Sequence, residues 1–421
     1  MSVTINPTDS LSGQITAPPS KAQTHRALIA GLLSNGTTTI TNPLSCDDTE
    51  ATADAVSLLG AEIARKPDAW QLQSTGIPQA PSNEIDCRES GVTLRFMIPT
   101  VSLAGGAKLS GKRNLMRRPI ASFAKAMEEL GVKLILRDDN LLVQGDPPIG
   151  GTVHIDGDVS SQFISGLIFA APHMVKGLHV ELTSPLESRG YVLLTINCMK
   201  QHGVVVQAND EFSFLDVHPG QTYLPADHEI PGDFSSAAYA LSAAAITESR
   251  VVVRGLSRMS KEPDMNVVQI LSRMGAEAIF QEDGLLIEGR KLKGISVDLR
   301  ENPDLGPIVA VLGAYAYGET RITGAKRLRY KESDRLAAVS SELTSLGAKI
   351  AETDDGLVVH GPSLLKGGTV KSYDDHRIAM ALSVAALCAE TPVIIEGAEC
   401  VSKSYPKFFD DFRSLGVDID G

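Results

Sequence analysis

The stretch Phe123-Ala124-Lys125-Ala126-Met127-Glu128-Glu129-Leu130-Gly131-Val132-Lys133-Leu134-Ile135-Leu136 carries the main architectural signal of this chain. Apolar residues at helical spacing lead to a glycine, and a short apolar run typical of a strand follows. Glycine commonly ends a helix because it adopts the left-handed conformation at little cost. Five further copies of the Leu-Gly-Val-Lys-Leu pattern, with His or Met also at the first position, lie at 59–63, 202–206, 274–278, 346–350 and 415–419.

The six glycines are separated by 71, 72, 72, 72 and 69 residues, which indicates one folding unit used six times. Turns such as Asp138-Asp139-Asn140 between apolar runs predict a hairpin after each glycine, and an Ala-rich helix falls earlier in most units. Each unit is therefore predicted to be βαβαββ. Because 421 residues exceed one hydrophobic core, we expect two α/β domains of three repeats each.

The chain composition is that of an ordinary globular protein, with 43% hydrophobic residues and a formal net charge of −12. A general nucleic-acid surface is therefore not expected, and no apolar run is long enough to span a membrane. The five scattered cysteines show no CxxC motif and no His partner at metal spacing, so we expect neither a disulfide framework nor a metal site. With no signal-peptide pattern, the expected location is cytoplasmic. A monomer is the default expectation.

Cations gather where five helices are predicted to begin, although the N-terminal end of a helix dipole repels positive charge. Their positions suggest that anions bind there, because free N–H groups at helix starts suit phosphate and carboxylate. Ordinary helix capping is the competing interpretation. The five segments are 19–26, 117–119, 327–335, 374–377 and 401–406, the last of which is predicted to open the final helix.

At these segments the chain resembles the family of 5-enolpyruvylshikimate-3-phosphate (EPSP) synthase, an enolpyruvyl transferase. The resemblance covers essentially the whole length and rests on short segments in family order. They are Ser20-Lys21 with Arg26, Glu89-Ser90-Gly91, Arg118-Pro119-Ile120, Ser160-Ser161-Gln162-Phe163, Gly232-Asp233, Pro303-Asp304, Lys331-Glu332-Ser333-Asp334-Arg335, Asp375-His376-Arg377 and Ser402-Lys403.

The resemblance implies two inside-out domains joined by a double hinge, one domain at 16–228 and the other at 1–15 with 229–421. The hinges are expected near 15–20 and 226–233. It also implies transfer of the enolpyruvyl group of phosphoenolpyruvate to the 5-hydroxyl of shikimate 3-phosphate, with no cofactor, no metal and no macromolecular partner. The two lobes are expected to close when the ligands bind.

The site residues come from the same resemblance. The implied phosphoenolpyruvate set comprises Lys21, Gly91, Arg118, Gln162, Arg335, Arg377 and Lys403. The implied shikimate 3-phosphate set comprises Lys21, Ala22, Arg26, Ser160, Ser161, Gln162, Ser188, Asp304 and Lys331. Arginine and lysine suit these anionic substrates because they give charge-assisted hydrogen bonds.

The reaction needs at least one acid and one base. By resemblance, Asp304 acts on the 5-hydroxyl and Glu332 on the methylene carbon of phosphoenolpyruvate. Lys21 and Lys403 are candidates to share the proton transfer, and the sequence does not divide the work between them.

Four positions depart from the family pattern. Ala22 stands where much of the family has Ser, Glu89 replaces a common Asn, Arg327 replaces an Asn and Gly190 replaces a Pro. For Glu89, two outcomes are open: it faces away from the phosphoenolpyruvate site, or it pairs with an arginine. The sequence does not decide whether glyphosate inhibits this chain.

Three other functions compete with this one. The related transferase acting on UDP-N-acetylglucosamine usually has a Cys just before the Arg-Pro segment, where this chain has Lys112-Arg113-Asn114-Leu115-Met116-Arg117. A non-catalytic repeat scaffold would not need Asp304 and Glu332 among cations. RNA-cyclase-like enzymes share the repeat, but the acidic balance argues against them.

Overall fold

The computed structural model describes residues 1–421 and divides into two compact units. One unit is Pro19–Ile230, and the other combines Met1–Pro18 with Pro231–Gly421. Each unit contains three four-stranded sheets and its own hydrophobic core. The chain passes from one unit to the other twice, between Pro18 and Pro19 and between Ile230 and Pro231.

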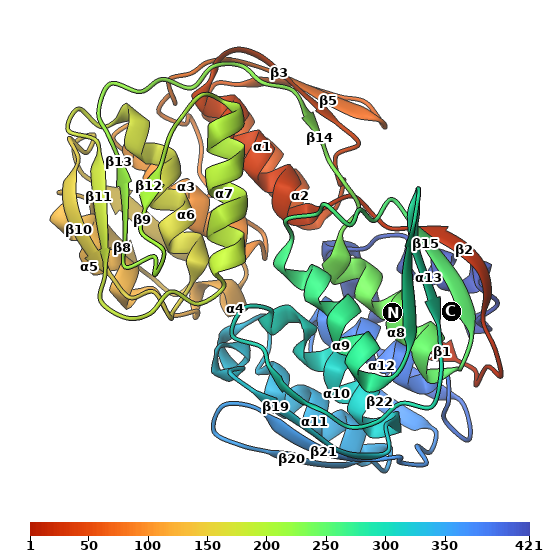
Figure 1. The fold of residues 1–421 in the computed structure, drawn as a ribbon. Helices are drawn as coiled ribbons and strands as arrows, with labels where there is room; N and C mark the ends of the chain where they lie inside the picture. The colour runs from red at the N-terminus through yellow and green to blue at the C-terminus, as the bar shows by residue number, and fades with distance from the viewer. The chain divides into compact units, whose positions relative to one another are not determined.

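The unit Pro19–Ile230 is built from three repeats (Figure 1). Its helices are α1 (Lys21–Leu33), α2 (Asp47–Leu58), α3 (Gly91–Ser102), α4 (Arg113–Met116), α5 (Ala121–Glu129), α6 (Ser161–Ala170), η1 (Ala171–His173) and α7 (Arg189–Gln201). Its strands are β3 (Asn35–Thr41), β4 (Glu62–Arg65), β5 (Ala69–Thr75), β6 (Ile85–Asp86), β7 (Gly106–Ser110), β8 (Lys133–Leu136), β9 (Asn140–Gln144), β10 (Gly151–Ile155), β11 (Leu178–Leu182), β12 (Gln207–Ala208), β13 (Phe214–Val217) and β14 (His228–Glu229).

The other unit repeats the same plan. Its helices are α8 (Phe234–Ile246), η2 (Pro263–Met265), α9 (Asn266–Met274), η3 (Pro303–Leu305), α10 (Gly306–Tyr315), η4 (Lys326–Tyr330), α11 (Arg335–Ser345), α12 (His376–Ala386), η5 (Ala398–Lys403) and α13 (Phe408–Ser414). Its strands are β1 (Ser2–Ile5), β2 (Ser12–Thr16), β15 (Arg250–Arg254), β16 (Glu277–Gln281), β17 (Gly284–Glu288), β18 (Ser296–Asp298), β19 (Gly318–Thr323), β20 (Lys349–Glu352), β21 (Leu357–Gly361), β22 (Gly368–Lys371), β23 (Val393–Glu396) and β24 (Ile419–Asp420).

All six sheets share one topology, which confirms the predicted βαβαββ repeat. In β10-β11-β13-β12, for example, β10 and β11 run parallel, and β11–β13 and β12–β13 are antiparallel. Three sheets take a strand from a distant part of the chain: β14 pairs with β3, β2 with β15, and β1 with β23 and β24. Each unit is therefore completed by pairing between strands that lie far apart in the sequence.

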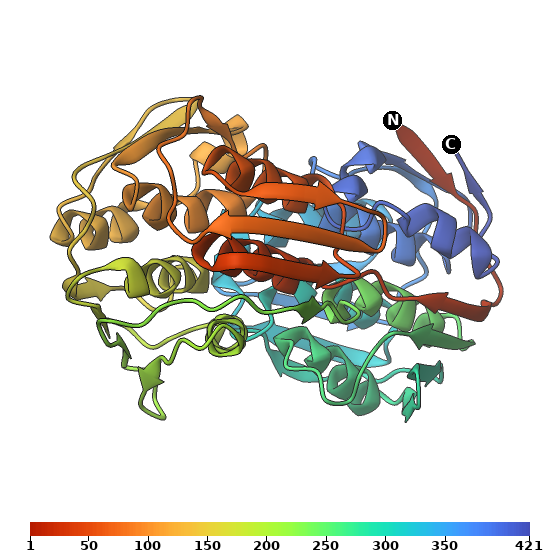
Figure 2. The same ribbon diagram turned by 90° about the horizontal axis from the view of Figure 1, so that it is seen from above.

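In each unit the sheets lie outside and the helices pack together inside. The first helix of every repeat is buried on nearly all sides, as a helix that is apolar all round must be: α1, α3, α6, α8, α10 and α12. Figure 2 shows the red-orange strands β3 and β5 lying over α1, which contacts both. No helix is both long and apolar enough to cross a membrane.

The repeated glycines end helices as predicted. Gly131 has φ 79° just after Leu130, the C-cap of α5, and Gly275 has φ 115° directly after α9. These are left-handed conformations in which a side chain is strained. The remaining four repeated glycines also have φ between 80° and 104°, so one backbone requirement explains all six positions.

Candidate active site

Arg335 is the centre of a charged cluster in the unit that contains Pro231–Gly421. It is the first residue of α11, after the N-cap Asp334, and its side chain is only 2% exposed. Its guanidinium donates to Asp375 (2.8 and 3.1 Å), Asp304 (2.8 Å) and Glu332 (2.6 Å). The arginine is therefore buried among three carboxylates.

Asp304 lies in η3 and faces three cations. Lys331 Nζ lies 3.1 Å from its carboxylate, and Arg377 lies 3.9 Å away, in addition to the Arg335 bond. Burial alone would raise the pKa of Asp304, but the charges of Lys331, Arg335 and Arg377 outweigh it and hold the pKa well below its usual range. For Lys331, burial is the larger effect and lowers its pKa.

Arg377 and Asp375 are placed by the start of α12. Asp375 is the N-cap and accepts from the Arg377 backbone N–H at 2.9 Å, while its carboxylate also binds Arg335. The Arg377 guanidinium donates to the backbone oxygen of Ser235 at 2.9 Å. One carboxylate therefore caps α12 and orients the arginine at the start of α11, which fixes two helix starts relative to each other.

Asp264 is a fully buried carboxylate beside this cluster and accepts a hydrogen bond from the Ser235 hydroxyl. Burial, and next the charge of Asp304, raise the pKa of Asp264 to about 6, against the opposing effect of Arg377. Around Arg335 the unit thus holds carboxylates whose pKa values are shifted in opposite directions, as is common where acid–base chemistry occurs.

Lys403 corrects one prediction. It is the last residue of η5, and the final helix α13 begins only at Phe408, so Lys403 does not open that helix. Its ammonium group donates to the backbone oxygen of Asp374 at 2.6 Å and to the Asp374 carboxylate at 2.8 Å. Lys403 is therefore held beside the loop that leads into α12, next to Asp375.

The unit Pro19–Ile230 holds the remaining candidates. Lys21 is the first residue of α1, after the N-cap Ser20, and forms a 2.7 Å ion pair with Asp48 of α2. His25 lies one turn later with Nδ1 2.7 Å from the hydroxyl of Thr52. Burial, and then the charges of Lys21 and Arg26, hold the pKa of His25 well below its usual value, so a neutral ring lies beside the two cations.

Arg26 is only 2% exposed and connects α1 to α7. Its Nε donates to the hydroxyl of Thr195 at 2.9 Å, and its other nitrogens donate to the backbone oxygens of Tyr191 (2.8 Å) and Ala22 (2.7 Å). Its guanidinium carbon also lies 5.6 Å from the centre of the Phe96 ring. Neutral groups accept these three hydrogen bonds.

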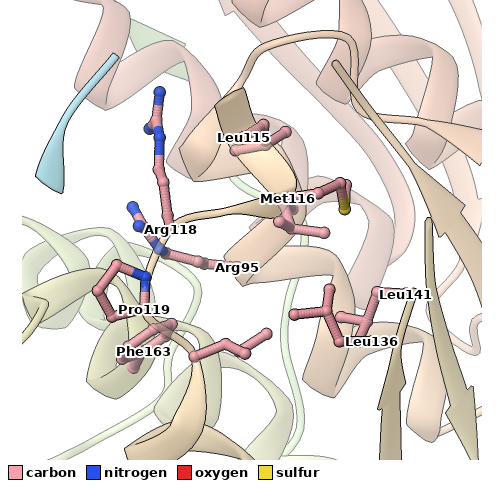
Figure 3. Close-up of a pocket in the computed structure, with 10 residues that line it drawn as sticks. Arg95, Leu115, Met116, Arg118, Pro119, Leu136, Leu141 and Phe163 are labelled. Atoms are coloured by element: carbon pink, nitrogen blue, oxygen red, sulfur yellow. The ribbon is translucent and has the colours of Figure 1, made fainter. Parts of the chain in front are cut away.

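Two arginines lie side by side near the start of α3 (Figure 3). Arg118, in the loop between α4 and α5, lies so close to Gly91 that a Cβ there would meet its Nη1 at 2.5 Å. Arg95, four residues after Gly91 on α3, donates to Gln162 Oε1 at 2.6 Å and stacks 5.3 Å from the centre of the Phe163 ring. The two arginines line a pocket whose apolar side is formed by Leu115, Met116 and Leu141.

The serine candidates occupy helix starts. Ser160 caps α6 by accepting from the Gln162 N–H at 3.3 Å, and Ser161 is the first residue of that helix. Ser188 stands before α7 in the left-handed conformation, with φ 55° and no capping bond from its side chain. The structure thus groups the candidates in two sets, with Asp304, Lys331, Glu332, Arg335, Arg377 and Lys403 in one unit and the others in Pro19–Ile230.

The departures from the family pattern also have defined contacts. Glu89 forms a 3.0 Å ion pair with Lys112. Arg327 donates to the backbone oxygen of Arg300 at 2.6 Å. Gly190 lies inside α7, where a proline in the first turn would also be tolerated.

Three charged residues near the candidates were not predicted from the sequence as site residues. Arg95 follows Gly91 by one helical turn, a spacing that places both on one face of α3. Asp48, the second residue of α2, binds Lys21, and Asp375, the N-cap of α12, binds Arg335. Acidic residues near helix starts could have indicated these partners, because a buried cation needs a counter-charge.

Comparison with known proteins shows the family of the chain. The family model described as EPSP synthase (3-phosphoshikimate 1-carboxyvinyltransferase) matches residues 5–412. The chain is 40% identical to the 3-phosphoshikimate 1-carboxyvinyltransferase of Clostridium kluyveri (99% of this chain, 98% of the relative) and 36% identical to that of Methanococcus maripaludis (99% of each). It also resembles the solved EPSP synthase of Acinetobacter baumannii, with a TM-score of 0.83, 25% identity and full coverage of both chains. The chain belongs to the EPSP synthase family.

Proposed function

We propose that the protein transfers the enolpyruvyl group of phosphoenolpyruvate to the 5-hydroxyl of shikimate 3-phosphate, releasing phosphate. The names of its relatives in Clostridium and Methanococcus support this reaction. The observation that carries the proposal is the pair Asp304 and Glu332, two carboxylates on one buried guanidinium, that of Arg335. An addition–elimination reaction needs such an acid–base pair close to cations.

The steps follow from the chemistry of the two substrates. Glu332 gives a proton to the methylene carbon of phosphoenolpyruvate, and the 5-hydroxyl oxygen attacks C2 as its proton passes to Asp304. The resulting tetrahedral ketal then breaks its C–O bond to phosphate, and the departing phosphate takes the proton from Asp304. Loss of a methyl proton to Glu332 restores the double bond. Lys21 and Lys403 are the further candidates for proton transfer, and cations also stabilise the charge on the departing phosphate.

The proposed binding sets are those of the resemblance, extended by Arg95. Arg118, Arg335, Arg377, Lys403, Lys21, Gly91 and Gln162 hold phosphoenolpyruvate, while Arg26, Ala22, Ser160, Ser161, Ser188, Gln162, Lys21, Asp304 and Lys331 hold shikimate 3-phosphate. The contact of Arg95 with Gln162 supports adding Arg95, because it orients the amide that both sets share. Arginine suits these positions because its planar fork binds oxyanions with two hydrogen bonds.

Bound substrate would change Asp304 itself. Without substrate, Lys331, Arg335 and Arg377 hold its pKa well below the usual range, which makes it a weak base. Substrate oxyanions that share these cations would weaken this effect and raise the pKa of Asp304. The base would then strengthen only when the substrates are bound.

We further propose that the protein acts in the cytoplasm as a monomer. All five cysteines are free, which fits a reducing compartment. Light scattering during size-exclusion chromatography would report one chain per particle, and two chains would reject the monomer.

The deciding experiment measures phosphate release from phosphoenolpyruvate with shikimate 3-phosphate or UDP-N-acetylglucosamine added in parallel. Release only with shikimate 3-phosphate is expected. Release only with the nucleotide sugar would assign the chain to the other transferase reaction. Release with neither acceptor would favour a non-catalytic scaffold that binds anions.

A further inference from the structure

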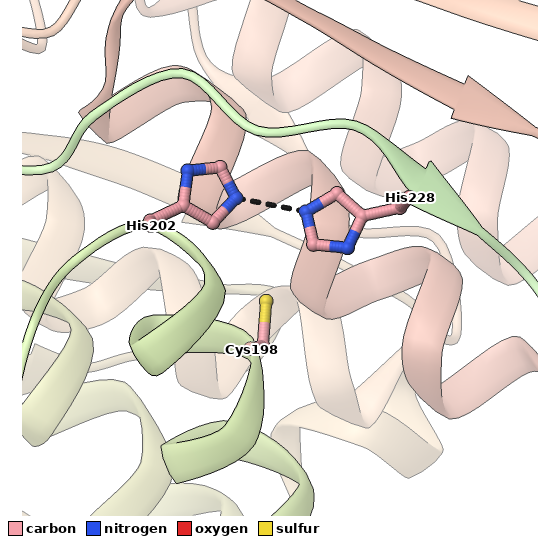
Figure 4. Close-up of side chains that lie close together, drawn as sticks. All are labelled: Cys198, His202 and His228. Carbon is pink, nitrogen blue, oxygen red and sulfur yellow. Dashed lines mark hydrogen bonds between the residues drawn. The ribbon is translucent and has the colours of Figure 1, made fainter.

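Three side chains with metal-binding atoms meet inside the unit Pro19–Ile230 (Figure 4). Cys198 and His202 lie four residues apart at the end of α7, on the same helical face, and His228 comes from β14. One donor atom from each lies within 4.8 Å of the others, and all three residues are buried. The expectation that no cysteine has a histidine partner is therefore wrong.

The two imidazoles face each other through their Nε2 atoms, which are 2.8 Å apart. The Nδ1 of His202 lies 2.7 Å from the backbone oxygen of Leu224 and 2.8 Å from the hydroxyl of Ser34. A carbonyl only accepts hydrogen bonds, so it fixes the His202 proton on Nδ1 and leaves a lone pair on Nε2. A carbonyl bound to the far nitrogen is the usual arrangement behind a metal-bound histidine.

We propose that Cys198, His202 and His228 bind one transition-metal ion, and the mixed thiolate and imidazole donors point to Zn²⁺. With Zn–N bonds of about 2.0–2.1 Å, tetrahedral geometry needs the two nitrogens roughly 3.3 Å apart. The pair has to widen by about half an ångström. The cluster supplies three of four ligands, so water occupies the remaining position.

A metal ion binds neutral imidazoles and a thiolate, so binding at this cluster would release the thiol proton of Cys198.

Binding of an ion would connect two elements of the unit. His228 lies in the strand that completes the sheet of β3, two residues before the unit ends at Ile230. An ion held by His228 and α7 would attach this last strand to the helix that Arg26 also contacts through Thr195. The site thus serves to hold the end of the unit in place and takes no part in the chemistry.

The competing explanation is a plain hydrogen bond between the two rings, with one imidazole donating. A second source of metal binding is an exposed row of histidines and carboxylates on and beside β10, β11 and β13, with Glu129 at the end of α5. The row comprises His154, His179, His218, Glu129, Glu181 and Asp216. The experiment must separate these two from the buried cluster.

The test uses the full chain, stripped with a chelator and then titrated with Co²⁺ and, separately, Zn²⁺. We expect one Co²⁺ per chain, with a thiolate-to-cobalt charge-transfer band, and one Zn²⁺ per chain, with a raised thermal midpoint. Cys198→Ser should abolish the band and His228→Asn should weaken Zn²⁺ binding at least tenfold. Cys87→Ser, at another buried cysteine, and His179→Asn, in the exposed row, should change neither.

A wild-type cobalt spectrum without a thiolate band would overturn the proposal. This measurement uses only the wild-type protein, so it does not depend on whether a variant folds. Loss of binding in His179→Asn with full binding in Cys198→Ser would assign the metal to the exposed row and also reject it. Absence of binding in the wild type would leave the hydrogen bond between the rings as the whole explanation. Because none of these readings uses turnover, they do not depend on the proposed function.

Discussion

A single guanidinium organises the candidate active site at the scale of residues. Arg335 binds Asp304, Glu332 and Asp375 at once, although a charge in a protein interior is costly. Its pKa is not lowered by this burial, because the three carboxylates more than compensate and raise it. Asp375 is fully buried and belongs to a helix cap, whereas Asp304 and Glu332 remain partly exposed and able to meet a substrate.

We predict that Asp304→Asn and Glu332→Gln each lower kcat by roughly 10²- to 10⁴-fold, the usual contribution of a general acid or base. The amides keep the size of the side chain, so the thermal midpoint should change little. Steady-state kinetics with both substrates measures the effect, and Asp298→Asn, an exposed carboxylate paired with Arg300, is the control. An unchanged kcat in either variant would remove that residue from the mechanism.

Gly91→Ala should raise the KM for phosphoenolpyruvate without unfolding the protein. The new methyl group would meet Nη1 of Arg118 at 2.5 Å and Nη1 of Arg95 at 3.1 Å. Both atoms end flexible side chains, so the arginines move instead of the backbone. We expect a KM increase of about tenfold, equal to about 1.4 kcal/mol of lost binding. An unchanged KM would show that Arg118 is not a phosphoenolpyruvate ligand.

Asp264 predicts a distinct pH dependence of stability. Its pKa is about 6 in the folded protein against 3.8 for the free side chain, so its folded state favours the protonated form. The stability that this gives is fully present below pH 3.8 and is lost as the pH rises through 6, by about 3 kcal/mol.

Asp264→Asn, which cannot ionise, should therefore raise the free energy of unfolding at pH 8 and leave it unchanged at pH 4. Urea unfolding at the two pH values measures this. An equal effect at both pH values would contradict the assigned shift.

The repeat requires special backbone positions at the scale of elements. Gly106 opens β7 with φ 101°, and a Cβ there would overlap the backbone oxygen of Val143 in β9. Gly105, just before it, has φ 86° but open space around it. A side chain at Gly105 would therefore cause conformational strain alone, whereas a side chain at Gly106 would add steric overlap.

Gly105→Ala should cost about 1–2 kcal/mol for the left-handed conformation alone. Gly106→Ala should cost roughly 2–4 kcal/mol, because the hairpin of β7 and β9 must also shift. Chemical denaturation of the two variants gives the comparison. Equal losses would mean that the strand pair adapts to the methyl group without cost.

Pairing between strands that are distant in the sequence defines the units at the scale of the whole molecule. The unit Pro19–Ile230 is continuous in sequence and has three complete sheets and its own core. The other unit needs β1 and β2 from the N-terminus to complete two of its sheets. Closure on ligand binding remains a prediction.

Residues 19–230 expressed alone should fold with a single cooperative transition. They should show no turnover, because Asp304 and Glu332 lie in the other unit. A shorter piece, 19–226, lacks β14 and should unfold at lower temperature, since the sheet of β3 loses its parallel edge strand. Circular dichroism during heating compares the two, and equal midpoints would show that β14 contributes nothing to stability.

The sequence by itself determined the repeat, its six helix-ending glycines, the hairpins and the α/β class, because these depend on local periodicity and backbone freedom. It also determined the family, since short motifs in a fixed order survive divergence. Lys403 was misplaced at the start of α13 because the boundary between a 3₁₀ turn and a helix leaves little trace in side-chain pattern.

Only the tertiary structure decided which charges meet. Asp375 lies 40 residues from Arg335, and Asp48 lies 27 residues from Lys21, so no local pattern could pair them. The same holds for His228, which reaches Cys198 and His202 only because β14 pairs with β3, far back in the chain. Contacts between distant segments follow from how sheets and helices pack, and that packing is a property of the folded chain as a whole.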